Sequence, residues 1–477
     1  MDRHPRIAFF SEHASPLALL GSEDAGGQNV YVDEVSRNLA QRGYAVDIFT
    51  RCDSYDVPEV VNYAPGVRVI HLGAGPAQFL AKDDLWKYMP DFREAFLRFM
   101  AYDDVSYDLL HGNFWMSGWV VSELQHSLHI PAVQIFHALG KTKHRHQGTM
   151  DSSPPERIAT EIATMQQVDR IIAQCPAEWA ELVEDYGVNP AKVVVIPSAV
   201  NTQTFHPVPR DEARRHIGLE TGELLIVYVG RMLPRKDARN IVRALALLMR
   251  WQEQGILSGP PLPPLRLLLV GGQTEEPNPI ATPEIGILQS LAQELGVADN
   301  VTFVGKRQQQ ELRYFYSAGD VVVTTPWYEP FGLTPLEAMA CGRPVIGSAV
   351  GGIRFTIKNG ETGFLVPPFD PEMLAVRLYQ LLSQPALGDR MGKAARLRVE
   401  RTFTWPVVAM RTDLLYQTLL KTHTHASLSV PARGKQPLSL EKMRMRRTTH
   451  TYGLRSIAPL HSPEVTGLPS MEDELWR

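Results

Sequence analysis

Cysteine is scarce in this sequence, which holds only Cys52, Cys175 and Cys341. The three are scattered, odd in number and without C-x-x-C spacing, so they exclude both a disulfide framework and a cysteine-based zinc site. A common metal-binding arrangement of two acids is missing as well. No D-x-D triplet occurs, and the chain therefore offers no such carboxylate pair to hold Mg²⁺ or Mn²⁺ against a diphosphate. We expect a protein that uses neither a metal nor a cofactor.

Long apolar runs are also absent. The N-terminal run Ile7 to Phe10 is too short for a signal-peptide core, and no stretch approaches the ~18 to 20 apolar residues of a membrane span. The formal net charge of -4 gives no overall attraction to nucleic acid. These absences predict a cytoplasmic protein whose partners are small molecules, with no membrane or nucleic acid among them. They leave the oligomeric state open.

The chain does contain enough apolar material for large cores. It has 477 residues, of which 44% are hydrophobic and 21% charged. This length favours two domains, since one domain usually takes ~100 to 200 residues. In the first half, strand-like runs alternate with helix-like segments. The predicted strands are Arg6 to Phe10, Tyr44 to Thr50, Arg68 to His71, Leu109 to His111, Ala132 to Phe136, Arg170 to Ala173 and Val193 to Ile196, with a helix over Gln28 to Arg42.

A break follows at Ile196 to Pro207, where two prolines and several polar residues indicate a hinge. The alternation then restarts, with strands predicted at Leu224 to Val229, Leu265 to Val270, Val301 to Val304, Val321 to Thr324 and Pro344 to Gly347. Two βαβ series predict an α/β protein with two Rossmann-like, doubly wound parallel-sheet lobes. We expect the first lobe at 1–200, the second at 201–404, a closing helix at 405–421 and a mobile tail at 422–477.

Two carboxylates bracket the most informative stretch, Glu329-Pro-Phe-Gly-Leu-Thr-Pro-Leu-Glu337. It follows a strand and enters a helix near Gly332, where backbone N–H groups can approach a phosphate. Glu337 is placed to accept hydrogen bonds from a ribose diol, and Glu329 to point into the cleft. Alternatively, the two glutamates mark an exposed start of a helix. The aromatic, proline and glycine residues between them disfavour this interpretation, because an ordinary helix cap does not require them. A glycosidase pair is disfavoured, because one glutamate lies in a loop and the other on a helix.

Cations follow the strand Leu224 to Val229, in Gly230-Arg231-Met-Leu-Pro-Arg-Lys236. At the carboxyl end of a strand, Arg231 and Lys236 can neutralise a departing nucleotide diphosphate. A solvated basic turn is the alternative reading of the same residues.

The first lobe offers a second anion site at Gly26-Gly27-Gln28, which opens a predicted helix. The glycines permit close approach of a diphosphate or sugar, and Gln28 can hydrogen-bond sugar hydroxyls. His137 directly follows a strand and can contact the transferred sugar, while Lys143 nearby can meet a phosphate. Metal binding by the local histidines is disfavoured, since the neighbouring cations would repel an ion.

At these residues the sequence resembles retaining glycosyltransferases of the two-lobed GT-B fold, in the group that includes sucrose synthase, sucrose-phosphate synthase and mycothiol glycosyltransferase. The resemblance covers about residues 6–420. It implies that Arg231 and Lys236 hold the donor diphosphate, with His137 at the sugar. The implied donor-site residues are Gly26, Gly27, Arg231, Lys236, Arg307, Glu329, Phe331, Gly332, Leu333 and Glu337. His137, Arg231, Lys236 and Glu329 are the implied catalytic residues.

Within that group, Gly-Gly-Gln28, Tyr-Glu-Pro-Phe-Gly-Leu333 and the segment Phe79 to Trp86 look like the sucrose-phosphate synthase pattern. That resemblance implies transfer of glucose from UDP-glucose, or from ADP-glucose, to fructose 6-phosphate, giving sucrose 6-phosphate. The acceptor ligands would then be Gln28, Lys82, Lys143 and Arg157.

Other segments point to different acceptors. His137 to Lys143 is similar to sucrose synthase, whose acceptor is fructose, whereas Ser11 to Leu17 is similar to mycothiol glycosyltransferase, whose acceptor is an inositol phosphate. A non-catalytic sugar-nucleotide-binding protein and a nucleotide-sugar epimerase are alternatives of other classes.

Overall fold

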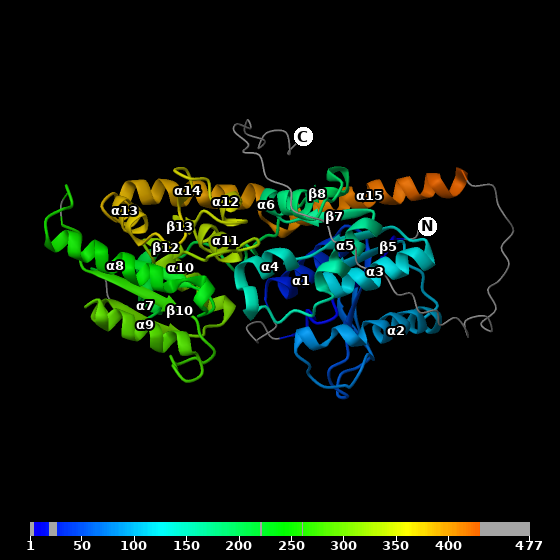
Figure 1. The fold of residues 1–477 in the computed structure, drawn as a ribbon. Helices are drawn as coiled ribbons and strands as arrows, with labels where there is room; N and C mark the ends of the chain where they lie inside the picture. The colour runs from blue at the N-terminus through cyan, green and yellow to red at the C-terminus, as the bar shows by residue number, and fades with distance from the viewer. Residues whose placement is uncertain (1–3, 19–25, 220–221, 260, 430–477) are drawn as a thin grey trace, which may run out of the picture. The chain divides into compact units, whose positions relative to one another are not determined.

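The structure is a computed structural model that describes residues 4–18, 26–219, 222–259 and 261–429. The predicted tail from residue 430 onwards lies outside the described residues. Two separate sheets are present, one built from the first half of the chain and one from the second (Figure 1). The predicted α/β fold with two parallel-sheet, Rossmann-like lobes is confirmed.

The first sheet has eight strands in the order β3-β4-β2-β1-β5-β6-β7-β8. All its pairings are parallel except that of β3 with β4. The strands are β1 (Arg6–Phe10), β2 (Ala45–Arg51), β3 (Val60–Ala64), β4 (Val67–Leu72), β5 (Leu109–Asn113), β6 (Ala132–Ile135), β7 (Arg170–Ala173) and β8 (Val193–Val195). The main helices are α1 (Gly27–Gln41), α2 (Met89–Tyr102), α3 (Trp115–Leu128), α4 (Gly140–Gln147), α5 (Arg157–Gln167) and α6 (Pro176–Ala180).

The second sheet has six parallel strands in the order β11-β10-β9-β12-β13-β14. The strands are β9 (Leu224–Val229), β10 (Leu265–Val270), β11 (Val301–Gly305), β12 (Val321–Thr324), β13 (Val345–Ser348) and β14 (Gly363–Val366). The helices are α7 (Arg210–His216), α8 (Ala238–Glu253), α9 (Pro283–Glu294), α10 (Gln309–Ala318), α11 (Leu333–Ala340), α12 (Ile353–Thr356), α13 (Pro371–Leu382) and α14 (Pro385–Thr402).

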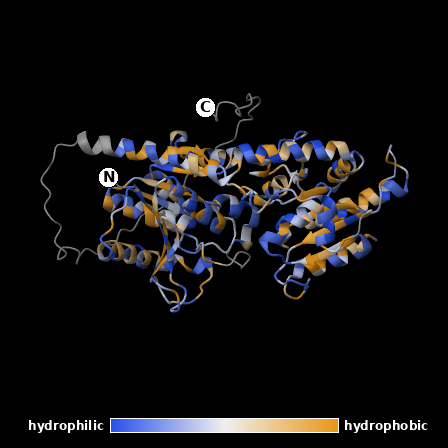
Figure 2. Ribbon diagram, turned by 180° about the vertical axis from the view of Figure 1, so that it is seen from behind, coloured by the Kyte–Doolittle hydropathy of each residue, from blue (hydrophilic) through white to orange (hydrophobic). Residues whose placement is uncertain are grey.

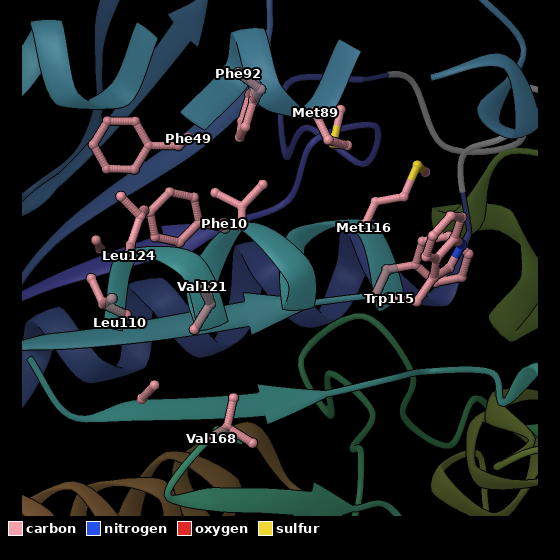
Figure 3. Close-up of a cluster of buried hydrophobic side chains, with 14 of the residues drawn as sticks. Phe10, Phe49, Met89, Phe92, Leu110, Trp115, Met116, Val121, Leu124 and Val168 are labelled. Carbon is pink, nitrogen blue, oxygen red and sulfur yellow. The ribbon is translucent and has the colours of Figure 1, made fainter. Parts of the chain in front are cut away.

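Each sheet is covered on both faces, which explains the apolar strands. In Figure 2 the strands are mainly orange, whereas the helices carry blue and orange residues side by side. One core of the first lobe lies between the sheet and α2, where Met89 and Phe92 point toward Phe10 and Phe49 (Figure 3). A sheet buried on both faces places its loops, and not its faces, within reach of ligands.

The last described helix, α15 (Trp405–Ser429), starts where the closing helix was predicted and continues beyond residue 421. Its apolar residues Trp405, Val408 and Tyr416 belong to the first lobe's second core. The chain therefore crosses between the lobes twice. The two crossings run side by side, since Val200 N–H donates to Phe403 O at 3.0 Å.

Candidate active site

Two loops of the second lobe bring the predicted donor residues together. Strands β9 and β12 are neighbours in the sheet, so the loops that follow them meet at one edge. Lys236 is the last residue of the short helix Pro234–Lys236, which follows β9. Its ammonium group donates a hydrogen bond to the carboxylate of Glu329, in the loop after β12, and forms an ion pair with it. Trp327 N–H also donates to Arg235 O at 2.9 Å. The sequence predicted both loops, and the structure shows that they are tied to each other.

The Glu329 carboxylate sits among cations. Burial alone would raise its pKa, but Lys236, Arg235 and Arg231 oppose burial and hold the pKa below its ordinary value. The side chains of Glu329 and Lys236 are only 17% and 19% exposed, so water screens the pair weakly. An ionised carboxylate of this kind accepts hydrogen bonds, as from sugar hydroxyls, and does not act as an acid. One amino group of Arg235 is buried without a hydrogen-bond partner beside this pair.

Glycines hold the Glu329 loop in place. Gly332 caps α11 with φ 86°, and a Cβ there would lie 3.2 Å from both Glu329 Cγ and Ile353 Cγ1. Gly351 has φ 41°, and its Cβ would lie 2.1 Å from Glu329 O. Gly352 N–H donates to that same oxygen at 3.1 Å. The support from Gly351 and Gly352 was not predicted, although a Gly-Gly pair in the loop that follows β13 is a signal for a tight backbone contact.

Glu337 lies on α11 and is oriented by Tyr316 of α10, whose hydroxyl donates to Glu337 Oε2 at 2.6 Å. Burial raises the pKa of Glu337, and the Tyr316 hydrogen bond partly offsets this. Glu337 and Leu333 help to line a pocket of about 100 Å³ together with Asn29 and other first-lobe residues. The role of Tyr316 at this site was not predicted, because Tyr316 and Glu337 lie on different helices that only the fold brings together.

The predicted first-lobe donor residues stand at the start of α1. A Cβ on Gly27 would lie 3.4 Å from Leu333 Cδ1, so this helix start faces α11. A Cβ on Gly26 would meet nothing within 4 Å. The Gln28 amide donates to Ser11 Oγ at 3.2 Å, which fixes the side chain predicted to reach the acceptor.

His137 follows β6 with φ 59° and is held on both ring nitrogens. Asn113 Nδ2 donates to Phe10 O at 3.1 Å, which leaves Asn113 Oδ1 to accept from His137 Nε2 at 3.1 Å. The Gln174 amide donates to His137 Nδ1 at 3.2 Å. Burial, reinforced by His13, lowers the pKa of His137 to about 3. The imidazole is therefore neutral and can hydrogen-bond a sugar without adding charge.

The predicted acceptor cations gather around Phe114 and Ser153. Lys82 Nζ lies 5.8 Å from the Phe114 ring centroid, and the Arg157 guanidinium 5.0 Å from it. Lys143 Nζ and Arg157 Nη1 both donate to Ser153 Oγ, at 2.9 and 3.1 Å. The structure thus brings near one another the three cations that the resemblance implies as phosphate ligands. Arg157, however, is only 2% exposed.

Two predicted donor residues make contacts of their own. The side chain of Phe331 is 4% exposed and packs in an apolar core with Phe403, so any contact of this residue with the donor would have to come from its backbone. Arg307 donates to Glu275 O at 2.8 Å and lines a different pocket of about 240 Å³, with His216 and Phe315.

One aromatic contact joins the lobes beside Glu329. The His146 ring of α4 stacks on Tyr328 with centroids 4.6 Å apart, and Gln147 Nε2 donates to the Tyr328 hydroxyl at 3.3 Å. The Arg235 guanidinium lies 5.4 Å from the same ring centroid. No pattern in the sequence predicts this contact. In the described ranges, no group of three His, Cys, Asp or Glu side chains is arranged to hold a metal ion.

Two Rossmann-like, parallel-sheet lobes have the architecture of the GT-B fold. The family description "Glycosyl transferases group 1" matches residues 209–398, and "Glycosyltransferase Family 4" matches residues 25–204. A D-inositol 3-phosphate glycosyltransferase from Nocardiopsis dassonvillei is 36% identical over 392 residues, covering 82% of this chain and 89% of the relative. The chain belongs to the group 1 glycosyltransferase family.

Solved structures agree with this assignment. A sucrose-phosphate synthase from Thermosynechococcus elongatus has a TM-score of 0.76 and 36% sequence identity, covering 88% of this chain and 100% of that one. The Anabaena protein HepE in complex with UDP-glucose has a TM-score of 0.61 at 17% identity, covering 90% of this chain and 100% of that one, and shows likeness of fold alone. Along the described part of the chain, no helix has the length and apolar character to cross a membrane.

Proposed function

We propose that the protein is a retaining, metal-independent glycosyltransferase that moves glucose from UDP-glucose to a small phosphorylated acceptor in the cytoplasm. The observation that carries this proposal is the pairing of Lys236 with Glu329 at the ends of two adjacent loops. A cation for the diphosphate and a carboxylate for the sugar are thereby held side by side. The choice of UDP-glucose as donor follows the resemblance to sucrose-phosphate synthase, and a sucrose-phosphate synthase structure that is 36% identical to this chain supports it.

The chemistry follows from charge. When the bond between glucose C1 and the diphosphate oxygen breaks, negative charge grows on the leaving phosphate, where Arg231 and Lys236 stabilise it. The acceptor hydroxyl attacks from the same face, and its proton passes to the leaving phosphate oxygen as the new C1–O bond forms. Glu329 binds hydroxyls of the transferred glucose, and Glu337 binds the ribose. No nucleophile of the protein is needed in this scheme.

Fructose 6-phosphate is the first candidate acceptor, and the 36% identity to a sucrose-phosphate synthase that the chain covers in full supports it. D-inositol 3-phosphate is the second candidate. It is favoured by a relative of equal identity that carries this acceptor in its name. Both acceptors bear a phosphate, and the Lys82, Lys143 and Arg157 cluster is the proposed site for it.

Product analysis separates these possibilities. Purified protein is incubated with UDP-glucose or ADP-glucose and with fructose, fructose 6-phosphate or D-inositol 3-phosphate, with and without EDTA. We expect one phosphorylated acceptor to be consumed with release of UDP, and proton NMR to show an α-configured glucoside. Donor binding without any product would support a non-catalytic binding protein. A changed donor sugar without acceptor consumption would support an epimerase.

A further inference from the structure

The proposed acceptor site carries as many carboxylates as cations. Arg157 Nε donates to Glu161 Oε1 at 2.9 Å, and Lys143 Nζ lies 2.9 Å from Asp151 Oδ1. Asp83, next to Lys82 in sequence, places its Oδ2 3.9 Å from Lys143 Nζ. A phosphate that arrives at this cluster therefore meets cations that already have negatively charged partners. The affinity for phosphate depends on whether any of these partners can leave.

The partner of Arg157 cannot leave easily. Glu161 is fully buried, and its two oxygens also accept from Gly140 N–H, both at 3.0 Å, and from the Tyr186 hydroxyl at 2.6 Å. Removing this carboxylate from Arg157 would leave several donors buried without partners, which costs more than a phosphate contact returns. The Arg157–Glu161 pair is consequently part of the scaffold that holds the start of α4.

Asp151 is differently placed. It lies between the helical turn Gly148–Met150 and α5, outside any helix or strand. Its Oδ1 accepts from Lys143 Nζ and from Ser153 N–H at 3.0 Å. Burial raises the pKa of Asp151, but the hydrogen bonds from Lys143 and Ser153 and the charge of Lys143 outweigh burial and lower this pKa to about 2, so the carboxylate is ionised at neutral pH. A close ion pair with Lys143, a longer contact of Oδ2 with His144 Nδ1 at 3.9 Å and the hydrogen bonds of Ser153 hold this carboxylate. These contacts are weaker than the set of buried donors that holds Glu161, so a stronger anion can replace Asp151.

We propose that Asp151 is an internal counter-ion that occupies Lys143 until the phosphate of the acceptor displaces it. This inference rests on the proposed function in one respect, namely that the acceptor is phosphorylated. A phosphate carries more negative charge than a carboxylate and therefore competes well for Lys143. An uncharged sugar hydroxyl does not. An unphosphorylated acceptor could reach Lys143 only by breaking the Lys143–Asp151 ion pair without replacing it. Asp151 thus selects against such acceptors.

The variant Asp151→Asn tests the proposal while preserving the turn, because the asparagine oxygen can still accept from Ser153 N–H. We expect the KM for the phosphorylated acceptor to fall about threefold to tenfold, as for loss of a competing ion pair. The KM for UDP-glucose should stay at the wild-type value. Asp185→Asn is the matched control. Asp185 pairs at 2.6 Å with Arg145, which lies on α4 as Lys143 does, and this pair includes no predicted acceptor ligand.

Inorganic phosphate provides a readout that does not need transfer. Phosphate is titrated against the melting temperature of the wild type, Asp151→Asn, Lys143→Met and the double variant. Asp151→Asn should bind phosphate more tightly than the wild type, and Lys143→Met should abolish that gain. Equal or weaker phosphate binding by Asp151→Asn, or a gain that persists without Lys143, overturns the proposal. Failure of transfer with every acceptor would count against the proposed function only, since this titration stands apart from it.

Discussion

Lys236 is the residue whose loss should separate catalysis from folding. Its ammonium group contacts Glu329 and is proposed to meet the leaving diphosphate. In Lys236→Ala we expect product formation to fall by about 10² or more, the usual consequence of losing one group that stabilises transition-state charge. Lys358→Ala is the control, because Lys358 is 42% exposed and pairs only loosely with Glu361 at 4.0 Å. Initial rates and melting temperatures are measured together, and near wild-type rates in Lys236→Ala would remove the assignment.

For Tyr316 we expect an effect on donor binding and not on the chemical step. Its side chain orients Glu337 but is not proposed to touch a substrate. Tyr316→Phe removes the 2.6 Å hydrogen bond, and we expect the KM for UDP-glucose to rise about threefold to tenfold with little change in kcat. That hydrogen bond lowers the pKa of Glu337, which burial raises. Without it the pKa rises further, so donor binding should be lost at a higher pH on acidification than in the wild type.

A pH series of donor KM values checks this shift. If Tyr316 had only a structural role, the variant would melt earlier while its donor KM and pH profile matched those of the wild type.

At the scale of single elements, the entrance of α11 depends on one glycine. Gly332 has φ 86°, and a Cβ would press on Glu329 and Ile353 at 3.2 Å. Gly332→Ala should therefore destabilise the fold by about 1 to 3 kcal/mol and weaken donor binding. Gly388→Ala is the matched control within α14, where the nearest atom to a new Cβ is Pro344 Cγ at 3.9 Å.

The control substitution replaces a helical glycine without strain, and it should stabilise by up to about 1 kcal/mol. Urea unfolding measures both variants. Similar losses in the two proteins would contradict the assigned role of Gly332.

The elements also show where sequence reasoning succeeds. Strands such as Leu224–Val229 were predicted to the residue, because a continuous apolar run is what a strand buried on both faces requires. Two strands were missed. Val60–Ala64 is an exposed antiparallel edge with little apolar pattern, and Gly363–Val366 is short and begins with a glycine. Weak periodicity gives no signal in either case.

At the scale of the molecule, the sequence predicted which loops form the site, because parallel strands share one carboxyl edge. It could not predict contacts between side chains that only the finished fold brings together. Tyr316 with Glu337, and His146 with Tyr328, are contacts of this kind. It also could not predict that the Phe331 side chain, inside the Glu329 to Glu337 motif, turns toward the core. The pattern of strands and motifs in a sequence therefore locates a site. The packing of the folded chain decides which side chains of that site face a ligand.

The helix α15 comes late in the chain, yet it packs on the first lobe, whose other elements precede residue 200. Trp405 is 2% exposed in the core with Tyr31, so Trp405→Ala should cost about 3 to 5 kcal/mol of stability. Leu414→Ala on the same helix is the control, because Leu414 is 57% exposed and should change stability by no more than about 0.5 kcal/mol. Urea unfolding followed by circular dichroism compares the two. Equal stability of both variants would contradict a stabilising role for this helix, whereas the large loss expected for Trp405→Ala would show that its packing stabilises the first lobe.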